Sequence, residues 1–254
     1  MPTCCVLPWH EFGSSACMAI KSGKIKIQSP VLHLSNQTSG RTFVCGDIHG
    51  CFSLLEQKLE EVHFNAETDW VICVGDLIDR GPESIRALEF LAKPWFYSVM
   101  GNHESMLLNV LSGNMSMMGV WMHEGGSWFN QVDSPDQVSK WVTEISKLPI
   151  IIEVTTRHGV VGIVHADIPP SLSWEEFVQK VKGGDEQAVF YALKGRSRAM
   201  RRVCEKVAGA WRIYCGHTFV PKPRQLGNVW CIDTGAYLGS DNGKLTLMEI
   251  SNVD

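Results

Sequence analysis

Five short apolar runs in this sequence each end in a polar segment that contains His, Asp or Asn. The segments are GDIHG at 46–50, GDLIDRG at 75–81, GNHE at 101–104, HAD at 165–167 and GHT at 216–218. The apolar runs have the character of buried strands, and sites in open α/β sheets form outside the carboxyl ends of the strands. Five loops at one sheet edge would therefore bring these side chains to one place.

The residue types in these segments indicate metal ions held by nitrogen and oxygen atoms. His, Asp and Asn without Cys suit Mn²⁺, Fe or Zn²⁺, and they disfavour a thiolate-rich structural zinc site. Asp47 and His49 are separated by one residue, so in an extended loop both side chains can lean toward the same cation. A carboxylate such as Asp76 can bridge two cations with its two oxygens.

The elements that would position these segments alternate in type through the first half of the chain. Strands are predicted at 42–45, 70–74 and 95–100, and helices at 52–62, from Pro82 to 91, and at 104–111. The order strand, loop, helix occurs three times, which predicts a mostly parallel sheet with flanking helices.

The second half of the chain is richer in strands, which are predicted at 150–155, 160–164, 212–215, 229–232 and 245–250. His158-Gly159 fits a hairpin turn between the first two, and helix is predicted at 137–147 and in pieces over 174–206. No linker divides the chain, so we expect one α/β domain over residues 41–254. Residues 1–40 are expected to be an N-terminal extension of unknown role, with a short strand around Ile25 and Ile27.

Composition narrows the classes of protein and of partner. The formal net charge of -4 gives no reason to expect a nucleic-acid partner, and no apolar run is long enough to span a bilayer. The first twenty residues lack the basic start and unbroken apolar stretch of a signal peptide, so we expect a cytoplasmic protein. The nine cysteines contain no Cys-x-x-Cys pair, which favours free thiols over disulfides or a zinc site.

The five polar segments, in this order, resemble the signature of the PPP phosphoprotein phosphatases within the calcineurin-like metallophosphoesterases. The chain is most similar to the short bacterial and bacteriophage serine/threonine phosphatases of that family. Five further segments also resemble the sequences of that subgroup: GNHESMLL, GGSWF, LPIIIEV, HADIP and IDTGA. The resemblance covers roughly residues 41–250. It implies an α/β fold in which a central β-sandwich of mixed sheets is flanked by helices, and it makes residues 41–254 a metallophosphoesterase catalytic domain.

The resemblance also implies a centre of two divalent metal ions, with Mn²⁺ as the first expectation and Fe or Zn²⁺ as alternatives. The bridging ligand would be Asp76. The remaining ligands would be Asp47 and His49 for the first metal and Asn102, His165 and His217 for the second, with Asn102 also near the substrate phosphate.

Four further residues receive roles in catalysis from the same resemblance. His103 is the expected general acid, Asp79 its carboxylate partner, and Arg80 a ligand of the phosphate oxygens. A second phosphate-binding arginine is expected near residue 196. The related proteins usually carry Trp two positions before this arginine, where Lys194 stands here, so Arg196 is favoured and Arg198 is the alternative.

Three other parts of the sequence fit more than one interpretation. Glu104 fits a charge at a helix N-terminus and also a partner that supports the metal ligands. The cluster of Met115, Met117, Met118, Trp121 and Met122 fits a substrate groove and also core packing. Trp128, which follows Gly125-Gly126, fits a position that flanks the site and also a position in the core.

The expected activity is metal-dependent hydrolysis of phosphoserine and phosphothreonine in proteins or peptides, by a metal-activated water. The alternative is hydrolysis of dinucleoside polyphosphates, whose enzymes share the fold but usually carry other residues in place of His49 and Asp79. A third reading, an inactive binding module, is disfavoured by the intact ligand set and by His103. We expect no nucleic-acid or membrane partner, and the sequence leaves the oligomeric state open.

Overall fold

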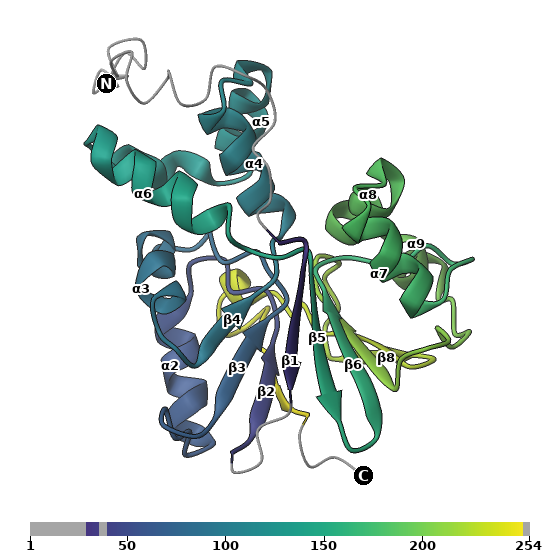
Figure 1. Cartoon of the computed structure of the whole chain (residues 1–254). Helices are drawn as coiled ribbons and strands as arrows, with labels where there is room; N and C mark the ends of the chain where they lie inside the picture. Colours follow the sequence, from purple (N-terminus) through teal and green to yellow (C-terminus); the bar gives the residue numbers. More distant parts are fainter. Residues whose placement is uncertain (1–28, 36–39, 251–254) are drawn as a thin grey trace.

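The computed structural model describes residues 29–35 and 40–250, which form two sheets packed face to face (Figure 1). The six-stranded sheet has the order β1 (Val31–Ser35), β5 (Ile151–Thr156), β6 (Gly159–Val164), β7 (Arg212–Cys215), β9 (Val229–Cys231), β8 (Arg224–Leu226). The four-stranded sheet has the order β10 (Leu247–Glu249), β2 (Thr42–Cys45), β3 (Trp70–Cys73), β4 (Phe96–Ser98).

Alternation of side chains along the strands explains why the two sheets pack together. In β3, Ile72 faces a core cluster shared by both sheets, whereas its neighbours Val71 and Cys73 face the opposite side. In β6, Val161 and Ile163 face the same shared cluster. Each such side chain contributes about 1.5–3 kcal/mol when fully buried. The predicted α/β fold with a central sandwich of mixed sheets is therefore confirmed.

Strand direction brings the polar segments to one end of the sandwich. Strands β2, β3 and β4 are parallel, and so are β6, β7 and β9, while β10 and β8 run antiparallel to their neighbours. The imidazole of His165, just after β6, lies 2.8 Å from the carbonyl oxygen of Val74, just after β3. The ends of the parallel strands in the two sheets therefore meet.

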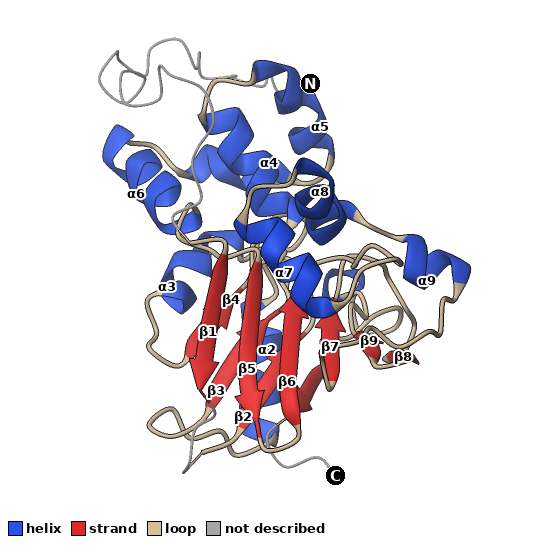
Figure 2. Ribbon diagram, turned by 45° about the vertical axis from the view of Figure 1, so that its right-hand side comes forward, coloured by secondary structure: helices blue, strands red, loops and turns tan. Residues whose placement is uncertain are grey.

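Helices cover the outer faces and the end of the sandwich. Helices α2 (Phe52–Glu61) and α3 (Ala87–Leu91) lie beside the four-stranded sheet, and α7 (Trp174–Lys182), α8 (Glu186–Lys194) and α9 (Ser197–Arg201) lie on the side of the six-stranded sheet. Figures 1 and 2 both show α4 (Asn102–Leu111), α5 (Met118–His123) and α6 (Pro135–Ile145) gathered beyond one end of the strands. Short 3₁₀ turns occur at Ser84–Arg86, Met115–Met117, Gly126–Gln131 and Ala236–Leu238.

Most predicted elements are present, and the differences have local causes. Pro82 does not open its helix, which begins two residues later as the 3₁₀ turn at Ser84–Arg86. Strand β8 was not expected, because its three residues Arg224–Leu226 form a short edge strand. The strand expected around Ile25 and Ile27 lies outside the described residues.

Strand β1 lies within the range expected as an N-terminal extension. It pairs with β5 in parallel, with Val31 opposite Ile151 and Ser35 opposite Thr155. The side chain of Val31 joins the core cluster that also contains Ile151. Residues 31–35 therefore contribute an edge strand to the six-stranded sheet.

Two expectations from composition can be compared with the described part of the chain. Its six cysteines are all free thiols, as their spacing predicted, and four of them, Cys45, Cys73, Cys215 and Cys231, are buried in strands. None of the helices in the described ranges is both long enough and apolar enough to cross a bilayer.

The contact between Gly162 and Trp174 gives a prediction about stability. A Cβ atom at Gly162 would lie 2.3 Å from the buried Trp174 indole, whose Nε1–H donates a 2.7 Å hydrogen bond to Glu153. We expect Gly162→Ala to lower the free energy of unfolding by about 1–3 kcal/mol, because the indole has to move. Urea unfolding would measure this change.

Gly119→Ala in α5 is the matched control. A Cβ there meets no atom within 4 Å, so its stability should stay unchanged or rise by up to about 1 kcal/mol. An equal loss in both variants would show that the indole contact is not the cause.

Candidate active site

Several residues of the predicted site have a backbone conformation that is unusual outside glycine. Seven non-glycine residues of the described chain have a positive φ, and five of them belong to the predicted site: His49, Asp76, Asp79, Arg80 and His217. Each such residue costs about 1–3 kcal/mol and persists only where surrounding contacts enforce it. The strand-end loops are therefore held in shapes that aim these side chains at one point.

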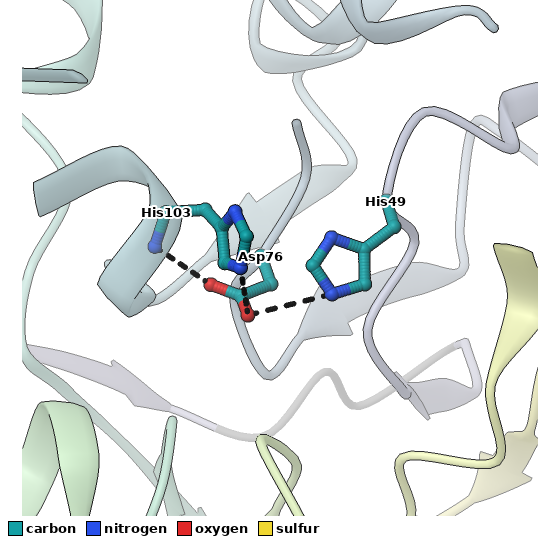
Figure 3. A group of neighbouring side chains, drawn as sticks. All are labelled: His49, Asp76 and His103. Atoms are coloured by element: carbon teal, nitrogen blue, oxygen red, sulfur yellow. Dashed lines mark hydrogen bonds and ion pairs between the residues drawn. The ribbon is translucent and has the colours of Figure 1, made fainter. Parts of the chain in front are cut away.

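Asp76 lies at the centre of this point. Figure 3 shows the imidazoles of His49 and His103 on either side of its carboxylate, with their Nε2 atoms 3.5 Å and 3.8 Å from Asp76 Oδ2. His165 Nε2 lies 3.5 Å from the same oxygen. Burial opposes ionisation of Asp76, but positive charge on the His165, His103 and His49 rings, when these are protonated in acid, lowers its pKa below the usual range. Asp76 is therefore an ionised carboxylate.

Two groups of three possible ligands share this carboxylate. One contains His49, Asp76 and His103, and the other contains Asp76, His165 and His217, with the ligand atoms of each group within 4.8 Å of one another. The arrangement offers two neighbouring cation positions with Asp76 between them. The first group contains His103, for which the sequence indicated an acid role, and does not contain Asp47.

Backbone carbonyls fix which nitrogen of two histidines faces the site. His49 Nδ1 lies 2.9 Å from the carbonyl oxygen of Ile78, and His165 Nδ1 lies 2.8 Å from that of Val74. A carbonyl only accepts, so Nδ1 carries the proton and Nε2 presents a lone pair to the site. Burial lowers the pKa of His49 to about 3 and also lowers the pKa of His165, so both rings are neutral.

The contact between His165 and Asn102 tests whether a cation fits the second position. His165 Nε2 lies 2.9 Å from Asn102 Oδ1, and with the ring proton on Nδ1 both atoms are acceptors. Two acceptors that face one another are satisfied by a cation. His217 lies in the same group, and burial lowers its pKa to about 2, which leaves it neutral as a ligand must be.

Asp47 lies at the edge of the same centre. Its carboxylate accepts a 3.0 Å hydrogen bond from the backbone N–H of His217, which joins the loops after β2 and β7. Burial, followed by the charges of Asp233 and Asp76, raises the pKa of Asp47, and burial raises that of Asp233 to about 6. Three buried carboxyl groups near neutral imidazoles form a site whose negative charge divalent cations would balance. The residues therefore fit a dinuclear centre with nitrogen and oxygen ligands.

Glu104 supports Asp76 from behind. Its carboxylate accepts hydrogen bonds from the backbone N–H groups of Asp76 at 3.0 Å, Leu77 at 2.8 Å and Gly101 at 2.8 Å. Burial and the charge of Asp76 raise the pKa of Glu104 to about 7, while the bonds from the backbone amides oppose that rise. Glu104 thus caps α4 and also fixes the left-handed turn at Asp76, so both interpretations of this residue apply.

His103 and Asp79 form a buried pair. His103 Nδ1 lies 2.6 Å from Asp79 Oδ2, and neither side chain is more than 1% exposed. Burial raises the pKa of Asp79, while the N–H groups of His103 and Trp128 oppose that rise. Burial opposes protonation of His103, but the charges of Asp76 and Asp79 raise its pKa. Because N–H donors surround the Asp79 carboxylate, we assign the shared proton to His103.

Arg80 lies beside His49 at the edge of the candidate site. Its guanidinium is held by a 3.1 Å ion pair with Glu124, a 3.0 Å contact with His49 Nε2, and stacking on the Tyr237 ring at 4.7 Å. Its side chain is 28% exposed, so it remains accessible to a ligand. This is the position expected of a group that binds phosphate oxygens.

The two candidate arginines after α8 differ in their surroundings. Arg196 is exposed, and its guanidinium donates to the carbonyl oxygen of His217, one of the candidate metal ligands, at 3.1 Å. Arg198 is buried and donates to the carbonyl oxygens of Val203 and Glu205 at 2.9 Å and 2.8 Å. Arg196 faces the site, whereas Arg198 closes the turn after α9.

Some residues of the site had no clear signal in the sequence. Trp121 and Trp128 both donate hydrogen bonds to Asp79, and Tyr237 contacts Arg80. The tryptophans lie 42 and 49 positions from Asp79, so no local spacing connects them. The run GGSW at 125–128 is the feature that could have indicated a close approach of this segment to the site.

Comparisons with known proteins agree with this geometry. The calcineurin-like phosphoesterase family matches residues 40–221. Serine/threonine-protein phosphatase 1 of Salmonella typhimurium is 36% identical over 211 residues, which cover 82% of this chain and 91% of that protein.

Two other proteins share part of the sequence or the fold. A symmetrical bis(5'-nucleosyl)-tetraphosphatase of Nitrosococcus oceani is 28% identical over 188 residues, covering 72% of this chain and 57% of that protein. The solved structure of a protein serine/threonine phosphatase from Saccharomyces cerevisiae has a TM-score of 0.56 at 17% identity, covers 95% of this chain and 88% of that one, and shows the same fold. The resemblance of the five polar segments is thereby confirmed, and the chain belongs to the calcineurin-like phosphoesterase family.

Proposed function

We propose that this protein hydrolyses phosphoserine and phosphothreonine in protein or peptide substrates, with two Mn²⁺ ions as its cofactors. The observation that carries the proposal is the buried His103–Asp79 pair, which lies directly beside the Asp76 centre. A serine or threonine alkoxide is a poor leaving group, so its departure requires a proton donor. The 36% identity to a bacterial serine/threonine-protein phosphatase supports the same substrate class.

The proposed ligands of the cations are Asp47, His49, Asp76, Asn102, His165 and His217. When bound, two divalent cations stabilise charge on the phosphoryl oxygens and promote deprotonation of the attacking water. The chain's own contribution begins with Arg80 and Arg196, whose guanidinium groups bind phosphate oxygens. Asn102, at the start of α4, is the third group proposed to contact the phosphate.

His103 completes the reaction as the general acid. Its Nδ1–H donates to Asp79, which leaves Nε2 directed toward the centre, 3.8 Å from Asp76 Oδ2. A proton on Nε2 is transferred to the leaving oxygen as the bond between that oxygen and phosphorus breaks. The Asp79 carboxylate stabilises the imidazolium before transfer and holds the ring in place.

The second candidate function is hydrolysis of dinucleoside polyphosphates. The relative from Nitrosococcus oceani, 28% identical over 188 residues, is the observation in its favour. It ranks second because the tetraphosphatases usually differ at the positions of His49 and Asp79, and because the phosphatase relative matches more of this chain.

A substrate comparison tests the proposed function. Purified protein should be incubated with a phosphoserine peptide and with diadenosine tetraphosphate, after chelation and after addition of Mn²⁺, Fe²⁺ or Zn²⁺. We expect release of phosphate from the peptide that is abolished by chelation and restored best by Mn²⁺. Rapid cleavage of the dinucleotide alone would overturn the proposal.

A second prediction concerns the general acid. His103→Asn should retain the bound metals, measured by elemental analysis, but lower kcat on a phosphoserine peptide by about 10²–10⁴-fold. His158→Asn is the matched control, since His158 is exposed in the hairpin before β6, at the end of that strand opposite to His165, and it should remain fully active. Full activity of the His103 variant would remove this residue from the mechanism.

A third prediction separates the two arginines. Arg196→Ala should lower kcat/KM by about 10–100-fold and leave thermal unfolding unchanged, because an exposed phosphate-binding group is lost. Arg198→Ala should instead lower the free energy of unfolding by about 1–3 kcal/mol, because the carbonyl groups of Val203 and Glu205 lose their donor. The opposite pattern would assign phosphate binding to Arg198.

A further inference from the structure

Asp79 is held by more donors than a simple histidine–aspartate pair requires. Trp121 Nε1 lies 3.0 Å from Asp79 Oδ2, the oxygen that also accepts from His103, and 3.2 Å from Oδ1. Trp128 Nε1 lies 2.6 Å from Oδ1. The carboxylate is 0% exposed, so these three side chains supply the N–H groups that replace water around it.

This arrangement fixes both the position and the rotation of the carboxylate. Each oxygen is bonded from a different direction, with His103 on one side and Trp128 on the other, and Trp121 donates across both. An indole N–H can only donate a hydrogen bond and an ionised carboxylate can only accept one, so the direction of these bonds is fixed. Rotation of the carboxylate away from His103 would break bonds to both tryptophans.

The two indoles are themselves locked by packing. The centroid of the Trp128 ring lies 4.8 Å from that of Trp141 and 5.2 Å from that of Phe129. The centroid of the Trp121 ring lies 5.6 Å from that of Phe129. Both tryptophans are buried, at 0% and 7% exposure. Donors whose side chains are locked by packing hold the group that they contact in one orientation.

The glycines before Trp128 allow this close approach. A Cβ at Gly126 would lie 2.6–2.8 Å from atoms of the Trp121 indole, including Nε1, so the ring rests flat on the Gly126 backbone. Gly125 has a φ of +109°, and a Cβ there would lie 2.4 Å from the backbone nitrogen of Arg80. The two glycines therefore bring the segment against both the Trp121 ring and the loop that carries Asp79.

We propose that Trp121 and Trp128 are positioning residues for the general acid. They hold the Asp79 carboxylate in one orientation, and Asp79 in turn aims the Nε2 of His103 at the leaving oxygen. The inference rests on the proposed role of His103 and gives residues 118–131, outside the five polar segments, a part in the same reaction. It accounts for the buried indole N–H groups, which core packing alone does not require.

The proposal predicts a dependence on the leaving group. Protonation matters most for an alkoxide such as that of serine and least for p-nitrophenolate, which leaves readily without a proton. We therefore expect Trp128→Phe in the full-length, Mn²⁺-loaded enzyme to lower kcat on a phosphoserine peptide by about 10–100-fold, a part of the whole acid contribution. On p-nitrophenyl phosphate the loss should stay below about 3-fold, and KM for both substrates should be unchanged.

Two further variants guard against a purely structural explanation. Replacing the Trp128 indole by its benzothiophene analogue keeps the ring shape and removes only the N–H, and it should show the same selective loss of kcat. Trp95→Phe is the matched control, since Trp95 packs against Phe64, Phe90 and Phe96. The side chains that donate to Asp79 among the described residues are His103, Trp121 and Trp128. Trp95→Phe should keep the ratio of the two activities.

A double-mutant cycle tests whether the indole acts through His103. In the His103→Asn background, Trp128→Phe should cause no additional loss on the phosphoserine peptide. A full additional loss, or an equal loss on both substrates in the single variant, would overturn the positioning role. Wild-type enzyme that is inactive on the peptide would instead overturn the proposed function, so the two failures are distinguishable.

Discussion

The buried, ionised carboxylate of Asp76 is the group on which the rest of the site depends. It is 2% exposed, and imidazoles from three other loops surround it, of which His49 and His165 use their second nitrogen to bond a backbone carbonyl. Its left-handed backbone is held by the carboxylate of Glu104, which bonds the amide of Asp76 directly. A buried negative charge is stable only where cations or protons balance it. The contacts that fix the Asp76 loop therefore also bury a carboxylate that divalent cations would stabilise.

A second buried carboxylate, Asp79, lies three residues further along the same loop and has the opposite surroundings. Asp76 faces the neutral imidazoles of His49 and His165, whose Nε2 lone pairs point toward the centre, whereas Asp79 faces N–H donors from His103 and two indoles. The first environment suits a metal ligand, and the second suits a group that stabilises an imidazolium. One short loop therefore separates two kinds of chemistry by the hydrogen-bonding partners that each carboxylate is given.

Much of the fold was predictable because it follows from local patterns. Strands β2 and β7 have the bounds that the sequence predicted, and the hairpin at His158-Gly159 joins β5 to β6. The short edge strands β1 and β8 were missed, since alternation over only five residues in β1 and three in β8 is too short to indicate a strand. The segments that carry the site were evident from their order. Contacts that depend on distant packing were not, and the bonds from Trp121 and Trp128 to Asp79 are the clearest case. Left-handed backbone at His49 and Asp76 was equally hidden, because it is imposed by tertiary contacts on residues that do not prefer it.

The distribution of the proposed metal ligands between the two sheets has a consequence for the molecule as a whole. His49 and Asp76 follow strands of the four-stranded sheet, whereas His165 and His217 follow strands of the six-stranded one. Elsewhere the shared face of the sandwich is a cluster of apolar side chains, which carry no directional bonds. Cations held at the centre would cross-link the two layers at the end where their loops meet. By thermodynamic linkage, the free energy of unfolding would then rise with the cation concentration. The supply of metal in the surroundings would therefore govern how long the protein stays folded as well as how fast it turns over substrate.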